Sequence, residues 1–325
     1  NHLHYLVCPD CGGSLSLSTR ETGSDEVVSG TLSCPVCDRT YPILNGVPRF
    51  VELKNYADNF GFEWNRHART QYDSYSGVNV SETRFFGETK WGRDLTGRVL
   101  LEVGCGSGRF TVHAAATGAM VVSFDYSAAV EANYASNGGT PNVLIVQADV
   151  YRLPFPKGFF DGVFCFGVLQ HTPDVRKTFF LLSGYLKSGG RLVADVYRKF
   201  GGVKRVLKTK YWVRSITKRL RPAVLYRLTR SYVNFMWPLS RYIHKLPYGK
   251  LLNWALFIAD YRGVFPLTEE LLKEWAILDT FDMLSPRYDK PQTLAVFTRW
   301  FHEAGLRHID VHYGYNGIEG RAEKP

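Results

Sequence analysis

Between residues 99 and 196 the sequence alternates short, continuously apolar segments with segments of helical apolar spacing. The apolar segments predict strands at 99–103, 120–125, 142–149, 160–169 and 191–197. The segments between them predict helices at 109–118, 128–136 and 178–190. Strands that are apolar on both faces and separated by helices indicate a parallel sheet covered on both sides.

The pattern continues differently on either side of this region. After it, residues 268–285 and 291–306 predict helices, 307–314 a strand, and the C-terminal residues a strand pairing back on it. Before it, residues 53–98 are polar and aromatic, typical of short helices. We therefore expect an α/β fold with a small unit at 1–52, a helical cap at 53–98, and a main domain at 99–325 that carries a basic helical insert at 197–265.

Four cysteines lie within the first forty residues, as CPDC and CPVC: Cys8, Cys11, Cys34 and Cys37. Two CxxC turns at this distance are typical of a zinc ribbon, since four thiolates satisfy tetrahedral zinc. A closed four-sulfur shell leaves no position for a substrate, so we expect a structural zinc ion. Disulfides or free thiols are the alternative. Cys105 and Cys165 stand alone, in glycine-rich or apolar surroundings.

The first strand runs into a glycine-rich turn, LLEVGCGSGRF. A dinucleotide site would have glycines in the spacing G-x-G-x-x-G, but here Arg109 occupies the last position and the glycines are Gly104, Gly106 and Gly108. Acids end the next two strands, at Asp125 and Asp149. Together with Glu102 and the later segments FDGVFCFGVLQHTPD and LKSGGRLVADVY, these residues resemble the class I S-adenosylmethionine-dependent methyltransferases. The resemblance implies a Rossmann-like, doubly wound sheet of seven strands.

The resemblance implies a cofactor site. Glycines let the backbone approach the ligand closely. Glu102 would engage the ammonium of the cofactor tail, Asp125 the ribose hydroxyls and Asp149 the adenine amino group, with Val150 along the ring. The resemblance places the remaining predicted cofactor residues, Tyr126 and Phe166, in the same site.

The first fifty residues, LVCPDCGGSLSL and LSCPVCDRTYPILNGVPRF, resemble the small zinc-ribbon family whose eukaryotic member activates tRNA and release-factor methyltransferases. Fused here to its enzyme, the ribbon would brace the catalytic domain. The segments at 60–91 and 278–305 resemble methyltransferases of bacterial surface-polysaccharide and natural-product gene clusters.

After the fourth strand, GVLQHTPDV places His171 where a general base could take a proton from an acceptor hydroxyl. Asp195, at the end of the fifth strand, could approach the same cavity. This resembles the His and Asp arrangement of natural-product sugar O-methyltransferases. The alternatives are a packing or capping role for His171 and a structural hydrogen bond for Asp195.

Further residues are weaker candidates. Polar or aromatic side chains of a predicted loop could face the site, as could residues of the cap that close over the cofactor; ordinary turns and packing are equally good explanations. They are Asp282, Tyr288 and Asp289 in the loop, and Trp64, Arg66, Gln71 and Tyr72 in the cap.

The formal charge of +10 is concentrated in the insert. From Val196 to Ala259 there are 15 Lys and Arg and no Asp or Glu. This segment could bind RNA, could lie on an anionic membrane surface carrying a lipid-linked sugar, or could be a helical lid with solvated charges. The sequence contains no apolar run of the length that a membrane span needs, and no segment resembling a signal peptide.

Three functions follow as hypotheses. The first is O-methylation of a glycan or other small molecule, lipid-linked or free, by a cytoplasmic enzyme that could be peripheral to the inner membrane face. The second is methylation of an RNA base by an enzyme with a zinc ribbon and a basic, RNA-binding insert. The third is a non-catalytic scaffold, against which the intact cofactor acids argue. The acceptor, the methylated atom and the oligomeric state stay open.

Overall fold

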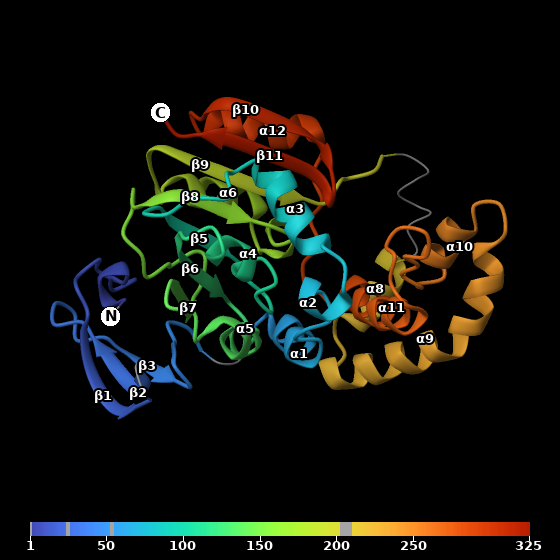
Figure 1. The fold of residues 1–325 in the computed structure, drawn as a ribbon, viewed down its shortest axis with the longest axis horizontal. Helices are drawn as coiled ribbons and strands as arrows, with labels where there is room; N and C mark the ends of the chain where they lie inside the picture. The colour runs from blue at the N-terminus through green and yellow to red at the C-terminus, as the bar shows by residue number, and fades with distance from the viewer. Residues whose placement is uncertain (1, 24–26, 53–54, 202–209) are drawn as a thin grey trace.

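The computed structural model describes residues 2–23, 27–52, 55–201 and 210–325. Figure 1 shows three parts in a row: an N-terminal β unit, a central α/β unit, and a helical lobe at the opposite end. Residues 202–209 of the predicted insert lie outside the described residues.

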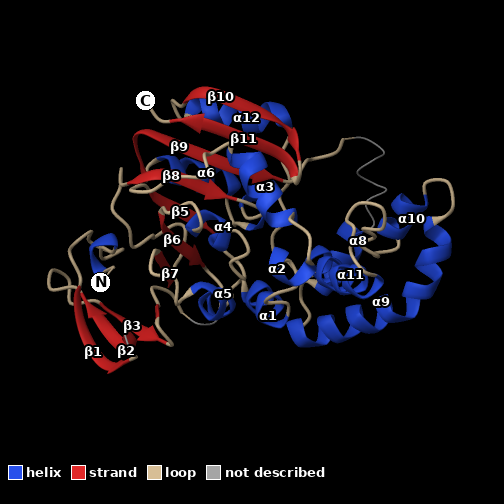
Figure 2. Cartoon of the chain, viewed as in Figure 1, coloured by secondary structure: helices blue, strands red, loops and turns tan. Residues whose placement is uncertain are grey.

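The central unit is built on a mixed sheet of seven strands (Figure 2). Its order is β10-β11-β9-β8-β5-β6-β7. Neighbouring strands from β7 to β9 run parallel, and β11 alone runs against its two neighbours. The strands are β5 (Val99–Val103), β6 (Met120–Asp125), β7 (Val143–Gln147), β8 (Phe160–Cys165), β9 (Leu186–Val196), β10 (Arg307–Gly314) and β11 (Gly317–Glu323). The predicted doubly wound sheet is confirmed.

Helices cover both faces of this sheet, which explains its continuously apolar strands. Consecutive residues point to opposite faces, so Leu100 joins one buried cluster and Leu101 the other. The first cluster includes residues of α3 (Val80–Thr89), α4 (Thr111–Ala115) and α5 (Val130–Asn137). The second includes residues of α6 (Val175–Ser183) and α12 (Leu294–Glu303).

Side-chain caps fix where several helices begin. Asp174 accepts a hydrogen bond from Lys177 N at the start of α6, and Thr293 accepts one from Val296 N at the start of α12. The prediction of a helix over 178–190 was wrong at its end. The helix stops before Gly184, and residues 186–190 extend β9, where Leu186 pairs with Phe160 of β8.

The N-terminal unit contains a short 3-10 turn, η1 (Leu3–Tyr5), and a four-stranded antiparallel sheet. Its strands are β1 (Ser16–Thr22), β2 (Val27–Ser33), β3 (Thr40–Leu44) and β4 (Val47–Pro48). It docks beside β7, where Phe50 N donates to Gln147 O at 2.9 Å and buried Arg49 donates to the Gln147 side chain at 3.0 Å. Arg49 also pairs with Glu131 of α5. The ribbon and the core therefore share one packed interface.

The helical lobe consists of α8 (Lys210–Thr217), α9 (Pro222–His244), α10 (Gly249–Ala255) and α11 (Glu269–Leu284). Apolar residues of α9 and α11 form a third buried cluster, onto which Phe62 of α1 (Asp58–Arg66) packs. The helix α11 therefore packs with the predicted insert, not on the sheet. A short helix, α2 (Asp73–Ser76), joins α1 to α3. None of the helices in the described residues is long and apolar enough to span a membrane.

Candidate active site

The glycine-rich loop after β5 has a backbone that only glycine adopts easily. Gly104, Gly106 and Gly108 have φ values of +72°, +54° and +90°. A Cβ on Gly108 would overlap the Asn133 side chain, and one on Gly104 would overlap Val168. Conformation and space together therefore demand these glycines.

Asp125, at the end of β6, is tied to this loop. One carboxylate oxygen accepts a hydrogen bond from Gly106 N at 3.0 Å, and the other accepts from Ser127 N and Oγ at 2.8 and 2.7 Å. These hydrogen bonds hold Asp125 at a fixed distance from the loop, as a site for a ligand's hydroxyls requires. Burial raises the pKa of this carboxyl.

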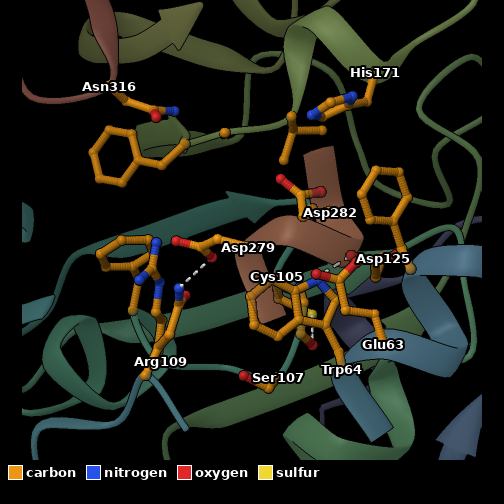
Figure 3. A pocket seen from close by; sticks show the side chains of 18 of the residues that line it. Glu63, Trp64, Cys105, Ser107, Arg109, Asp125, His171, Asp279, Asp282 and Asn316 are labelled. Atoms are coloured by element: carbon orange, nitrogen blue, oxygen red, sulfur yellow. Dashed lines mark hydrogen bonds between the residues drawn. The ribbon is translucent and has the colours of Figure 1, made fainter. Parts of the chain in front are cut away.

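A cavity of about 420 Å³ opens beside the loop, within the usual size range for small-molecule sites. Its floor is formed by the loop, the end of β6 and the segment that follows β8, and its roof by the helical lobe. Figure 3 shows side chains from α1, α11 and the loop projecting into it. Seven of the predicted cofactor and catalytic residues line it: Gly104, Gly106, Asp125, Tyr126, Val150, Phe166 and His171.

The other predicted cofactor residues lie behind this lining. Glu102 is 2% exposed, and its carboxylate accepts hydrogen bonds from the hydroxyls of Thr111 and Ser123. Burial raises the pKa of Glu102 to about 7, although these hydroxyls lower it. In the described structure Glu102 therefore braces the sheet end. Gly108 also lies outside the lining, as does Asp149, which precedes the lining residue Val150 and accepts from Tyr151 N at 2.9 Å.

His171 lies on a 3-10 turn, η2 (Leu169–His171), which follows β8. Its Nδ1 is 2.9 Å from the Tyr288 carbonyl oxygen. A carbonyl only accepts, so Nδ1 carries the hydrogen, and Nε2 of the neutral ring has a free lone pair. The ring packs against Phe60 and Tyr197 at the cavity wall, with centroid distances of 5.1 and 5.4 Å. The turn therefore presents a proton acceptor at the cavity.

Asp195 has the setting that the alternative interpretation, a structural hydrogen-bond role, describes. Its side chain is fully buried and outside the cavity lining. One oxygen accepts from Gly167 N at 2.6 Å, and the other accepts from Arg84 and from Asn316 Nδ2 at 3.2 Å. With both oxygens engaged, Asp195 positions the loop after β8 and the side chains of Arg84 and Asn316.

Three carboxylic acids that face the cavity were weakly signalled or missed in the sequence. Glu63 of α1 is fully buried, and neither carboxylate oxygen has a hydrogen-bond partner among the described residues. Asp279 and Asp282 face the cavity from α11 (Figure 3). Burial, and next the charges of these two aspartates, raises the pKa of Glu63 well above its usual value. Burial therefore favours the uncharged form of the Glu63 carboxyl, and a bound cation would favour the carboxylate.

Asp279 and Arg109 were both missed. Asp279 accepts hydrogen bonds from Tyr261 Oη and from Gln71 Nε2, the latter at 3.4 Å. Burial raises the pKa of Asp279 to about 7. Arg109 directly follows the glycine motif and lines the same cavity; burial, and next the charge of Arg84, lowers its pKa to about 10. The cavity thus offers both acidic and basic groups.

The weaker candidates divide between the cavity and its supports. Trp64, Gln71, Asp282 and Asp289 line the cavity. The other three lie behind it: Arg66 over the Tyr226 ring, Tyr72 donating to Ser107 O at 2.7 Å, and Tyr288 bonding His171 through its carbonyl. Asp289 pairs with Lys210 at 3.0 Å and with Arg214, which fixes α8 over the cavity.

The four N-terminal cysteines come together as predicted, and their sulfur atoms all lie within 4.8 Å of one another. Sγ of Cys8 is 3.6 Å from that of Cys37, and Sγ of Cys11 is 3.4 Å from that of Cys34. Sulfurs about 2.3 Å from a tetrahedral zinc ion would be roughly 3.8 Å apart, whereas a disulfide needs about 2.05 Å. The donor set therefore fits zinc. The described residues that line the cavity begin at Tyr56, beyond this unit.

Two family models match the chain: "Methyltransferase domain" over residues 101–194 and "Trm112p-like protein" over residues 2–46. A tRNA U34 carboxymethyltransferase of Klebsiella pneumoniae is 30% identical over 179 residues, 51% of this chain and 50% of that protein. An uncharacterized chloroplastic methyltransferase of Arabidopsis thaliana is 29% identical over 134 residues, 38% of each chain. The chain thus spans half or less of these relatives' lengths.

Among solved structures, a Haloferax volcanii complex of the Trm112 methyltransferase activator with a methyltransferase aligns with a TM-score of 0.45 and 13% identity. The alignment covers 82% of this chain and 98% of that one. The two family matches agree with the seven-stranded sheet and the four-cysteine cluster of the structure. The chain therefore combines a methyltransferase domain with an N-terminal Trm112p-like zinc ribbon.

Proposed function

We propose that this chain is an S-adenosylmethionine-dependent methyltransferase. The observation that carries the proposal is one cavity lined by the glycine-rich loop, Asp125, Val150 and His171, within a region matching a methyltransferase domain. The residues fit the cofactor. The strained loop allows close backbone approach, Asp125 can accept from ribose hydroxyls, and Val150 and Phe166 offer apolar surface to the adenine. The bound cofactor would supply an electrophilic methyl group on a positively charged sulfur.

Glu63 completes the cofactor's electrostatic environment in this proposal. A buried carboxyl without a partner is costly, and the cofactor carries an ammonium and a sulfonium that could provide one. Trp64 would be the lid: its indole lies against Gly106, with Nε1 only 3.2 Å from where a Cβ would stand. Both side chains come from α1, so the predicted cap would close the site.

His171 would receive the proton that the acceptor loses on methylation. Its Nε2 lone pair is available because Nδ1 donates to Tyr288. The flanking rings of Phe60 and Tyr197 hold the imidazole in one plane at the cavity wall. Asp195 would act only through Gly167 and Arg84, as a positioning residue.

We propose RNA, and a tRNA base in particular, as the acceptor. The tRNA name of the Klebsiella relative supports this, as do the basic side chains of Arg109 and Lys210 in the cavity lining. Because the cavity is roofed by helices, a base would have to leave its stack to enter it. Aromatic side chains of the lobe at the cavity, Tyr261 and Trp275, could stack on such a base.

A small-molecule acceptor is the second candidate. The same enclosure by the helical lobe favours it, because ligands of drug size are commonly buried in such cavities. Arg109 and Asp279 would then select for an acceptor with both an anionic and a hydrogen-bond-donating group.

The cofactor proposal is tested by titrating the purified protein with S-adenosylhomocysteine in a calorimeter. We expect binding in the micromolar range, weakened at least tenfold by Asp125→Ala, since charge-assisted hydrogen bonds are typically worth about 1.5–3 kcal/mol. The control is Glu270→Ala, an exposed acid at the start of α11, which should bind like the parent. Absence of binding by the folded, zinc-loaded protein would sink the proposal.

The acceptor is tested by transfer of a radiolabelled methyl group to host extract, before and after ribonuclease treatment. Label in the tRNA fraction that ribonuclease releases supports the RNA acceptor. Label that persists in a small-molecule fraction replaces it with the second candidate. Label in neither, from a protein that binds the cofactor, overturns both.

A further inference from the structure

We propose that the outer face of α9 docks this chain on the surface of an anionic lipid membrane. More than half of the exposed large apolar side chains in the described structure fall between residues 212 and 256. On α9 they form one stripe, at steps of four, seven, four and three residues: Val224, Leu228, Phe235, Leu239 and Tyr242. Such steps place all five side chains on a single face.

This stripe is separate from the face that α9 buries. Leu225, Val233 and Trp237 point into the helical lobe and pack with α11. Phe235 is 81% exposed and Tyr242 69%. Figure 1 shows α9 along the outer edge of the lobe, away from the sheet. The helix therefore has a second apolar face that the described chain leaves uncovered.

Exposed cations accompany the stripe. Arg221, Arg227, Arg230, Arg241 and Lys245 are exposed on or beside α9. Of these, Arg241 alone pairs with a carboxylate in the described residues, with Glu269 at 3.7 Å. The sequence from Val196 to Ala259 contains no acid that could neutralise the others locally. A long helix with an apolar face and a basic flank is the pattern of interfacial helices that lie on anionic lipid.

The composition of the stripe favours lipid over two other occupants. RNA-binding faces offer aromatic rings and cations, but three of the five stripe residues are aliphatic and have no flat ring on which a base could stack. A second copy of this chain would bring the same cations against one another. An anionic bilayer satisfies both features, since its headgroups attract the cations and its acyl region takes the apolar side chains.

The proposal is tested by flotation of the full, zinc-loaded chain with vesicles of phosphatidylcholine, alone or mixed with phosphatidylglycerol. We expect flotation with the mixed vesicles only. Phe235→Gln with Leu239→Gln should weaken partitioning about tenfold, since two apolar side chains no longer enter the bilayer. The matched control is Leu17→Gln with Leu44→Gln, two exposed apolar residues of the ribbon sheet. Each variant's affinity for S-adenosylhomocysteine reports that its core is intact.

A second pair of variants tests the charges. Arg227→Glu with Lys245→Glu should also reduce partitioning by roughly tenfold or more, whereas Arg20→Glu on β1 should not. Lack of flotation by the parent chain would overturn the proposal. Unchanged flotation of the Phe235 and Leu239 variant would also overturn it. A shift of that variant from dimer to monomer, without any vesicle binding by the parent, would overturn it as well, because the face would then bind a second copy of the chain. Loss of RNA binding alone in this variant would assign the face to RNA instead. Because flotation needs no acceptor, failure here is distinct from failure of the proposed enzymatic function.

Discussion

At the scale of single residues, the imidazole of His171 has one nitrogen committed to the Tyr288 carbonyl and the other available at the cavity. For His171→Ala we expect methyl transfer to fall about 100- to 10 000-fold, the usual contribution of a positioned base. Affinity for S-adenosylhomocysteine should change by less than about threefold, because cofactor binding does not use the lone pair. The control is His302→Ala on the exposed side of α12. Parallel losses in rate and cofactor affinity would instead indicate a packing role.

Glu102 makes a prediction about stability. Burial raises its pKa from 4.5 to about 7, so the folded state holds a proton that the unfolded chain releases near pH 4.5. The unfolding free energy is therefore highest, as far as Glu102 is concerned, below pH 4.5, where both states hold the proton. It falls as the pH rises towards 7, because only the folded state then keeps the proton. Relative to Glu102→Gln, the cofactor-free parent should therefore lose on the order of 3 kcal/mol of unfolding free energy between pH 4.5 and 8. Urea unfolding at several pH values measures this, and a difference independent of pH contradicts it.

At the scale of elements, the glycine-rich loop and its neighbours offer a matched pair of substitutions. Gly108 has φ +90° and abuts Asn133, whereas a Cβ on Gly139 meets nothing within 4 Å. Gly108→Ala should cost roughly 2–4 kcal/mol, from the left-handed backbone and the overlap together. Gly139→Ala should cost less than about 1 kcal/mol. Denaturant unfolding of both variants decides the matter, and equal effects would mean that the loop relaxes at little cost.

The elements that sequence predicts well are those whose pattern is local. Strand and helix alternation placed the five parallel strands, and the glycine spacing placed the loop, because both follow from periodicity and backbone sterics. The end of α6 was missed because residues 186–190 are held as strand by contacts that periodicity does not record: Leu186 pairs with Phe160 of β8, and Gly189 and Gly190 bond the backbone of Lys324.

The features of the site that the sequence does not reveal depend on partners distant in sequence. Asp195 is engaged by Arg84 and Asn316, which lie 111 and 121 positions away. Glu63 and Asp279 meet at one cavity only because α11 packs against α1. The sequence of neither helix indicates that one of its acids points into the protein. Without the fold, an acid at a strand end is equally compatible with chemistry and with structural hydrogen bonds.

At the scale of the whole molecule, the zinc ribbon and the cavity lie on different sides of the central unit. The ribbon packs beside β7 through Phe50 and Arg49, and the described lining of the cavity contains no ribbon residue. The helical lobe, by contrast, supplies the cavity roof. The two appended parts are therefore expected to contribute differently, one to stability and the other to the acceptor.

Zinc removal separates these contributions. Small four-cysteine units depend on the metal for folding, so a strong chelator, or Cys34→Ser, should unfold the ribbon and expose the β7 edge to proteolysis. Thermal unfolding should then begin at lower temperature, while S-adenosylhomocysteine affinity stays within about threefold, since the glycine-rich loop and Asp125 make no contact with the cysteines. Refilling with zinc should restore the protected state, which excludes damage to the chain as the cause. Loss of cofactor affinity together with the metal would show instead that Arg49, through Gln147 and Glu131, transmits the ribbon's order to the end of β6 and thus to the site.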